Sequence, residues 1–462
     1  MFSRLLLVPI LACLSTITAH AERSEFRSET VDRYIGEQIR TGTVPGAAIA
    51  IVHRGELVHA AGYGQTEPGG EPVTPEHTFR SASTLKMMVG MALVRLHDEG
   101  RLDLHAPISR YLHGLDPAIG ALTTHELLNH TSGLLDTSVE HSTPRTMPLL
   151  DYARSLDSRF IYVSPGASFS YSNPGYAVAG AVLEAATGLS FEQAMRELLL
   201  APLHMDSSTF SLTEAQRTGL AVGHRLTDSG MQAVAPSETG LAAMPSGTMF
   251  STVLDYANFL TAFIDNGQFQ GRAVWRPSAA EIMQSPQIPP AELVTSYSYS
   301  YGLMNGQFFG QTALFHTGGM PGYASNVLIL PELDLGVVLF TNGEELDRRE
   351  VLRRIVAEFT DLPEQTQNPA PSGLAPLSPA AAAELFGIYE QRDDLPTIRI
   401  FQAGEEVLLR NRGVDYVLHH EGDEFYIGVA ENGRWFRFRI AVTPDGKYRF
   451  VQWWIRSFAR RI

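Results

Sequence analysis

Ser83-Thr84-Leu85-Lys86 opens an apolar segment that runs to Glu99 and ends at Gly100. The segment carries one hydrophobic stripe, which predicts a helix over residues 84–99. Spacing of three places the Ser83 hydroxyl and the Lys86 amine on one face, within reach of each other. A helix N-terminus offers N–H groups and a positive dipole end that favour a developing oxyanion. A neutral lysine can take the serine proton, so the pair is a candidate nucleophile and base.

The S-x-x-K tetrapeptide alone is a weak signal, because serine is common at helix N-caps. The lysine content strengthens it. The chain has 35 basic residues, of which only Lys86 and Lys447 are lysines. Arginine keeps its proton in proteins, whereas a desolvated lysine can lose it. Lysine retained at position 86 therefore indicates a site that needs a neutral amine, while Lys447 lies in a predicted turn.

Length and charge restrict the class of protein. A chain of 462 residues favours one large domain and a smaller one. Hydrophobic residues make up 44%, which is enough to fill a sizeable core. A formal charge of −15 argues against a nucleic-acid-binding surface, which requires clustered basic side chains.

The first 21 residues are predicted to be a signal peptide. A short basic start is followed by an apolar run at residues 5–12 and by Ala19-His20-Ala21, a typical cleavage site. Cys13, the only cysteine, allows the alternative of lipoprotein processing and a lipid anchor. No later apolar run is long enough to span a bilayer. The expected location is periplasmic or secreted, and a mature chain that starts after Ala21 has no thiol.

Hydrophobic periodicity divides the remaining chain into two domains. Strands are expected at residues 46–53, 56–61, 298–304, 324–330 and 335–341, and helices at 28–40, 84–99, 176–187, 190–199 and 346–360. Early and late strands around a helical middle predict an α+β domain over residues 22–362. Its sheet would be built from both ends of the domain and would have a helical subdomain inserted.

Prolines are concentrated in residues 363–380, and this composition predicts a linker. Residues 381–462 then alternate between short strand-like runs and glycine-containing turns. Strands are expected at 397–401, 406–410, 414–419, 424–427, 434–442 and 448–455. A small antiparallel sheet or barrel is the prediction for this C-terminal domain.

Two further motifs carry side chains suited to acyl transfer. Tyr171-Ser172-Asn173 is expected in a loop before the helix at 176; its phenol could exchange a proton with Lys86, and its amide could orient the lysine. His316-Thr317-Gly318-Gly319 closes a strand whose glycines allow a substrate backbone to approach. Taken singly, each motif is equally consistent with an ordinary turn.

Together and in this order, the three motifs resemble the penicillin-recognising serine enzymes, which include class C β-lactamases, D,D-peptidases, D-aminopeptidases and related esterases. The resemblance covers roughly residues 28–360 and includes the segments 46–50, 127–134 and 245–248. It implies a β-lactamase/transpeptidase-like fold, with an antiparallel sheet flanked by helices, and no cofactor. The C-terminal domain resembles the β-barrel appended to some of these hydrolases.

The resemblance also implies roles for the motif residues. Ser83 would be the acylated nucleophile, Lys86 the group that lowers its proton affinity, and Tyr171 the shuttling base. Asn173 would align both. The remaining residues, His316, Thr317 and Gly318, would line the substrate, with backbone N–H groups of Ser83 and Gly319 as the oxyanion hole.

His316 departs from the pattern, since β-lactamases of this group usually carry lysine there. A histidine is mostly neutral at pH 7, so a permanent cation for a substrate carboxylate is missing. The expected activity is therefore that of a peptidase, on D-amino-acid peptides, or of an esterase. The open alternatives are a β-lactamase and a non-catalytic penicillin-binding or sensor protein. The partner is a small-molecule or peptide substrate, and the oligomeric state is left open.

Metal and nucleotide sites are not expected. His125 and His130 are five residues apart, which turns their imidazoles about 140° from each other on a helix and excludes H-E-x-x-H. Neither the G-x-S-x-G elbow nor a dinucleotide fingerprint is complete.

Overall fold

The computed structural model describes residues 26–136, 139, 143–227, 229–238, 240–288, 297–362, 371–390, 397–411, 413–442, 446, 448–453 and 456–461. The predicted signal peptide and residues 363–370 of the predicted linker lie outside these residues.

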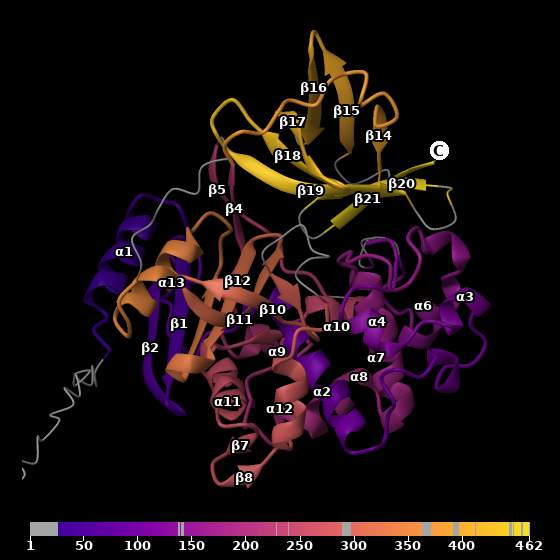
Figure 1. The fold of residues 1–462 in the computed structure, drawn as a ribbon. Helices are drawn as coiled ribbons and strands as arrows, with labels where there is room; N and C mark the ends of the chain where they lie inside the picture. The colour runs from indigo at the N-terminus through magenta and orange to yellow at the C-terminus, as the bar shows by residue number, and fades with distance from the viewer. Residues whose placement is uncertain are drawn as a thin grey trace, which may run out of the picture.

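The first domain is organised around a seven-stranded antiparallel sheet in the order β2-β1-β13-β12-β11-β10-β9 (Figure 1). Its strands are β1 (Gly46–His53), β2 (Glu56–Gly64), β9 (Ser298–Tyr299), β10 (Met304–Phe308), β11 (Gln311–Met320), β12 (Tyr323–Leu330) and β13 (Leu335–Thr341). β1 pairs with β13 from Ala47↔Thr341 to His53↔Leu335. The expectation that both ends of the domain build one sheet is therefore confirmed.

Successive side chains of β1 point alternately into two hydrophobic cores, one on each face of the sheet. Ile49 and Ile51 pack with α1 (Glu29–Arg40) and α13 (Arg348–Ala357). Ala48 and Ala50 face the opposite core, which contains the larger set of helices. These include α2 (Lys86–Asp98), α7 (Asn173–Thr187), α11 (Val253–Ile264) and α12 (Pro277–Gln284). Because both faces are covered, seven of the eight residues of β1 are buried.

The inserted region between β2 and β9 is rich in helices and loops, as expected. Its other helical segments are η1 (Ala82–Leu85), η2 (Ile108–Arg110), α3 (Pro117–Gly120), α4 (Thr124–Leu128), α6 (Leu149–Ser155), η3 (Ser158–Phe160), α8 (Phe191–Met195), η4 (Arg196–Leu200), α9 (Leu212–Arg217), η5 (Leu241–Ala243) and α10 (Met244–Gly247). Short strand pairs join β3 (Phe79–Arg80) to β6 (Phe250–Ser251), β4 (His224–Thr227) to β5 (Gly230–Ala233) and β7 (Gln268–Phe269) to β8 (Arg272–Ala273). A last short helix, η7 (Pro331–Leu333), links β12 to β13.

The C-terminal region is an eight-stranded antiparallel meander in sequence order. The strands are β14 (Gly387–Tyr389), β15 (Ile398–Ala403), β16 (Glu406–Asn411), β17 (Val414–Gly422), β18 (Phe425–Val429), β19 (Trp435–Val442), β20 (Tyr448–Trp453) and β21 (Arg456–Arg461). β21 returns to β14, where the Arg460 guanidinium donates to the carbonyl oxygens of Phe386 and Glu384. A separate apolar cluster fills the space between the strands. The α+β fold with an all-β C-terminal region is confirmed.

Several elements differ in detail from the sequence expectation, and three of these differences lie near the Ser83 and Tyr171 motifs or in the sheet. The helix expected over 84–99 starts with the 3-10 turn η1. The strand expected over 298–304 is split into β9 and β10, because Gly302 turns the chain with φ +89°. Helix α7 starts at Asn173, since Ser172 accepts the Gly175 N–H as N-cap and Pro174 suits the first turn. Asn173 is therefore a helix residue, although a loop was expected.

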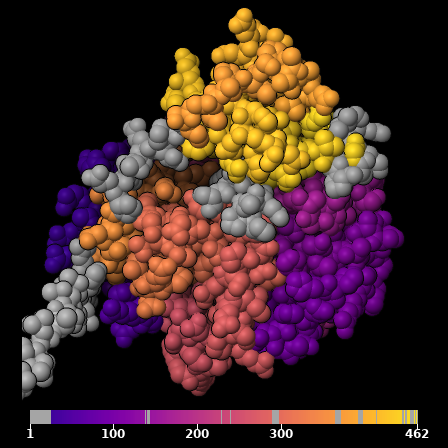
Figure 2. All heavy atoms as spheres, in the orientation of Figure 1, coloured from indigo at the N-terminus to yellow at the C-terminus, as the bar shows by residue number. Residues whose placement is uncertain are grey.

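The C-terminal barrel packs on the helical region (Figures 1 and 2), and the contact includes residues 162–168, which precede the Tyr171 motif. Ala441 of β19 and Phe450 of β20 form an apolar cluster with Tyr162 and Val163. Beside it, the Ser168 hydroxyl donates to Gln452 Oε1 at 3.3 Å. The two parts of the chain thus share a buried contact.

Candidate active site

Ser83 and Lys86 meet as the spacing predicted. The Lys86 Nζ lies 3.1 Å from Ser83 Oγ and 2.8 Å from Asn173 Oδ1, and it donates to the Ser246 carbonyl oxygen. The lysine side chain is fully buried. Its three oxygen neighbours come from α7, α10 and η1, so one amine connects three segments that are far apart in sequence.

The backbone around Ser83 is tightly constrained. Ala82 has φ +49°, a conformation that costs a non-glycine residue free energy and that often marks functional sites. Gly247, with φ +149°, packs directly on this turn. A Cβ added there would come within 2.7 Å of the Ala82 carbonyl carbon and 2.9 Å of Ser83 N. The motif at 245–248 therefore holds the nucleophile turn in place.

Asn173 is oriented by a residue that the sequence analysis did not single out. Asp136, which is 5% exposed, accepts from the Asn173 backbone N–H at 2.9 Å and from its Nδ2 at 3.1 Å, both at Oδ1. This fixes which end of the amide faces Lys86. Asp136 is one of many acidic residues outside any motif, so no sequence signal identifies it.

Tyr171 stands beside the lysine, with Lys86 Nζ 5.0 Å from the centroid of its ring. The tyrosine is 4% exposed. Its ring lies 4.3 Å from that of His130 and 6.2 Å from that of His316. The structure thus brings all three motifs to one place.

His316 lies behind the site. It is 1% exposed, and both ring nitrogens have protein partners: Nδ1 lies 2.7 Å from the Thr317 carbonyl oxygen and Nε2 lies 3.1 Å from the Tyr299 hydroxyl. Burial, aided by the Lys86 charge, lowers the pKa of His316 to about 3. The imidazole is therefore neutral at pH 7 and is engaged within the protein.

Gly318 and Gly319, which follow His316 on β11, have two different environments. β10 pairs with β11 only as far as Phe315, and beyond that residue β11 lies next to η1. A Cβ on Gly318 would meet Ser325 Oγ at 2.1 Å and Ser81 O at 2.8 Å. A Cβ on Gly319 would meet no heavy atom within 4 Å. Gly318 is thus required for packing, whereas Gly319 faces open space.

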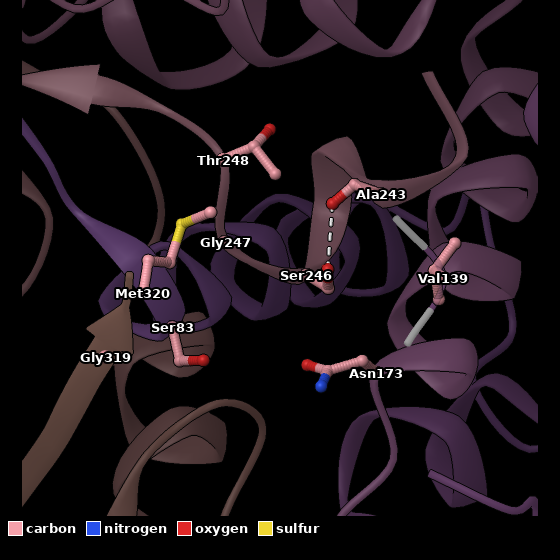
Figure 3. Close-up of a pocket in the computed structure, with 9 residues that line it drawn as sticks. All are labelled: Ser83, Val139, Asn173, Ala243, Ser246, Gly247, Thr248, Gly319 and Met320. Atoms are coloured by element: carbon pink, nitrogen blue, oxygen red, sulfur yellow. Dashed lines mark hydrogen bonds between the residues drawn. The ribbon is translucent and has the colours of Figure 1, made fainter. Parts of the chain in front are cut away.

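A cavity of about 120 Å³ lies against Ser83 (Figure 3). Ser83, Asn173 and Gly319 border it together with small or uncharged residues, namely Val139, Ala243, Ser246, Gly247, Thr248 and Met320. Figure 3 shows the Ser83 hydroxyl and the Asn173 amide on the same side of this space. Thr317 is partly exposed on β11, the strand that also carries Gly319, and is not among the lining residues. Such a cavity can bring an uncharged carbonyl group to the hydroxyl.

Comparison with known families identifies the class. The beta-lactamase family model matches residues 31–361, and the chain belongs to this family of serine hydrolases. The protein flp of Staphylococcus aureus (strain N315) is 26% identical over 324 residues, covering 68% of this chain and 63% of that protein. The chain thus spans under two thirds of the length of such relatives. Penicillin-binding protein 4 of Amycolatopsis lactamdurans is 26% identical over 379 residues, covering 76% of this chain and 95% of that protein.

Solved structures confirm the fold over almost the whole chain. The crystal structure of SurE matches with a TM-score of 0.75 at 23% identity and covers 94% of this chain and 99% of that one. The octameric penicillin-binding protein homologue from Pyrococcus abyssi has a TM-score of 0.64 at 22% identity, with the same coverage. The D-amino acid amidase from Ochrobactrum anthropi SV3 has a TM-score of 0.60 at 23% identity and covers 72% of this chain and 99% of that one.

Among the residues that the structure describes, none of the helices is both long and apolar enough to cross a bilayer.

Proposed function

We propose that this chain is a hydrolase that forms an acyl-enzyme on Ser83 and cleaves an amide or ester. The observation that carries the proposal is the buried Lys86 amine, 3.1 Å from Ser83 Oγ and held by two further oxygens. A neutral amine would donate its two protons to Asn173 Oδ1 and Ser246 O. It would then offer its lone pair to the Ser83 hydroxyl, which is the arrangement that general-base catalysis requires.

The proposed reaction has two steps. The Ser83 oxygen attacks the substrate carbonyl carbon as its proton passes to the Lys86 amine, from which the Tyr171 hydroxyl can relay it. N–H groups of Ser83 and Gly319 stabilise the negative charge on the carbonyl oxygen. The proton then goes to the leaving amine or alcohol as the carbon–heteroatom bond breaks. Water repeats the sequence on the acyl-enzyme and releases the acid and free Ser83.

The preferred substrate has no free carboxylate beside the scissile bond. The position at which related β-lactamases carry a cation is here His316, which is neutral and buried. Among the described residues, those that line the cavity carry no charged side chain. Two similar structures hold D-amino acids, SurE with D-Leu and the amidase with D-phenylalanine. These observations support D-aminoacyl amides, D-peptides and esters as substrates ahead of β-lactams.

A panel of substrates tests this proposal. Purified mature protein is incubated with nitrophenyl esters, D-aminoacyl amides, D-Ala-D-Ala peptides and a chromogenic cephalosporin. Hydrolysis should be fastest for an ester or D-aminoacyl amide, and Ser83→Ala should abolish it. Ser246→Ala is the matched control, because it removes a hydroxyl that lines the cavity but keeps the carbonyl that binds Lys86. Turnover that survives in Ser83→Ala would refute the proposal, as would turnover confined to the cephalosporin.

We also propose that the chain is exported and cleaved after Ala21, and that its C-terminal barrel acts as a lid or specificity element. N-terminal sequencing of the processed protein tests the first proposal against lipid modification at Cys13. Removal of residues after about 370 tests the second, since unchanged substrate preference would contradict it.

A further inference from the structure

The segment from Leu127 to Leu134, which has no role in the chemistry above, supports the loop that carries Tyr171. The His130 carbonyl oxygen accepts the Ser170 N–H at 2.8 Å, and the Thr131 carbonyl oxygen accepts the Gly166 N–H at 2.8 Å. His130 itself adopts φ +62°, which is uncommon for a residue with a side chain. This local conformation accompanies a fully buried imidazole.

The His130 imidazole contacts two parts of the Tyr171 motif. Its Nδ1 accepts the backbone N–H of Ser172 at 3.1 Å. Its ring lies 4.3 Å from the ring of Tyr171, at an interplanar angle of 37°. One side chain therefore positions both the ring of the shuttling tyrosine and the backbone that leads to Asn173.

The direction of each hydrogen bond beyond His130 follows from its partners. Since Nδ1 accepts from Ser172, a neutral His130 carries its proton on Nε2 and donates it to the Tyr299 oxygen, 3.2 Å away. His316 faces a carbonyl oxygen with Nδ1, so that nitrogen carries the proton and Nε2 accepts. The Tyr299 hydroxyl, 3.1 Å from this Nε2, is then its donor.

Ionisable neighbours surround this chain of bonds on every side. The Tyr176 hydroxyl contacts Tyr299 and donates to the Leu128 carbonyl oxygen at 2.9 Å. Lys86 faces the His316 ring from α2, and Tyr171 faces it from the loop before α7. Burial lowers the pKa of His316 and raises that of Tyr299 well above its ordinary value, so both groups stay neutral near pH 7.

We propose that His130 and Tyr299 are positioning residues that join the two walls of the active site through one fixed hydrogen-bonded chain. It runs from the Ser172 N–H through His130, Tyr299 and His316 to the Thr317 carbonyl oxygen. In this arrangement His316 orients the β11 backbone and is held neutral next to the Lys86 amine, while Tyr171 is held at its working distance. The catalytic part of this inference rests on the proposed function, whereas the hydrogen-bond directions do not.

Imidazole tautomers test the chain without reference to activity. In ¹⁵N-histidine-labelled wild-type protein at pH 7, two-bond ¹H–¹⁵N spectra should show His130 as the Nε2–H form and His316 as the Nδ1–H form. Single His→Asn variants assign the two signals. The opposite tautomer at either residue, or a doubly protonated ring, would overturn the proposal even if the protein proves inactive.

A pair of tyrosine variants tests the positioning role. Tyr299→Phe keeps the ring and removes the hydroxyl between the two histidines. Tyr301→Phe is the matched control: this tyrosine is equally buried, at 1% exposure, and its hydroxyl lies 2.7 Å from His125 Nδ1, outside the chain described above. Tyr299→Phe loses two buried tyrosine–histidine hydrogen bonds and Tyr301→Phe loses one, so a general packing effect should appear in both variants.

Ser83 acylation by a fluorophosphonate probe should slow roughly 10- to 100-fold in Tyr299→Phe, by analogy with the loss of a residue that orients a metal ligand. It should change less than about twofold in Tyr301→Phe, because this hydroxyl bonds to His125 outside the chain of bonds. Tyr299→Phe should also raise the pKa of His316 above its wild-type value, because the hydrogen bond that the Tyr299 hydroxyl donates to Nε2 favours the neutral ring. The histidine ¹⁵N spectra at falling pH measure this shift. Equal acylation rates in the two variants, or an unchanged titration of His316 in Tyr299→Phe, would refute the positioning role.

Discussion

Alanine at position 319 adds a single methyl group next to the nucleophile. A Cβ on Gly319 has no protein heavy atom within 4 Å, and this residue borders the cavity of about 120 Å³ that contains Ser83. The fold should therefore accept the methyl group, whereas a substrate carbonyl should be displaced by it. Misplacement of reacting atoms by about 1 Å costs on the order of 100-fold in rate, which corresponds to about 2.7 kcal/mol in activation free energy.

The assay compares Gly319→Ala with Gly318→Ala in thermal unfolding and in the rate of Ser83 acylation. Gly318→Ala forces a Cβ to 2.1 Å from Ser325 Oγ and 2.8 Å from Ser81 O, so it should lose roughly 1–3 kcal/mol of stability. Gly319→Ala should keep the wild-type unfolding midpoint and acylate about 100-fold more slowly. An unchanged acylation rate in folded Gly319→Ala would show that substrate does not use this space, and would refute the reasoning.

Three further predictions concern the site, the core and the barrel. Asp136→Asn should slow acylation of Ser83 roughly 10- to 100-fold, because the carboxylate oxygen that fixes the Asn173 amide is replaced by an amide that can rotate. Asp157→Asn, at a helix N-cap, is the control. Equal acylation rates in the two variants would contradict the role of Asp136. Burial raises the pKa of Asp255 from 3.8 to about 6, so its contribution to stability is present below pH 3.8 and is lost as the pH rises through 6. Between pH 3.8 and 6 the free energy of unfolding of the wild type should therefore fall by about 3 kcal/mol, and Asp255→Asn should remove this decline. If urea unfolding shows the same dependence on pH in Asp255→Asn as in the wild type, the prediction is wrong. Phe450→Ala should destabilise the barrel contact by about 3–5 kcal/mol and expose it to limited proteolysis; an unchanged cleavage pattern would argue that the contact is weak.

Local signals in the sequence sufficed for the sheet and for the serine–lysine pair. β1 is recognisable because a run of small and branched apolar residues is buried on both faces. Ser83 and Lys86 are three positions apart in the sequence, and helical geometry alone brings them together. The joining of early and late strands in one sheet was also expected from the positions of the apolar runs, whereas the order of the strands was not.

Contacts between distant segments could not be read from the sequence. Asp136 meets Asn173 across 37 positions and His130 meets Tyr299 across 169, and neither of the two acceptors, Asp136 and Tyr299, lies in a motif that the sequence shows. The placement of His316 inside the protein likewise depends on Tyr299, which arrives from another strand. In the barrel, β14 has only three residues, too few for hydrophobic alternation to be visible.

The most direct test of the central claim is the mass and position of a covalent adduct. Intact-mass measurement after brief exposure to a fluorophosphonate or a D-aminoacyl ester should show one added acyl or phosphonyl group, and peptide mapping should place it on Ser83. Lys86→Met should reduce the rate of that addition by roughly 100-fold or more, as expected when a general base is removed. An adduct on any other residue, or modification of Ser83 at an undiminished rate in Lys86→Met, would contradict the account.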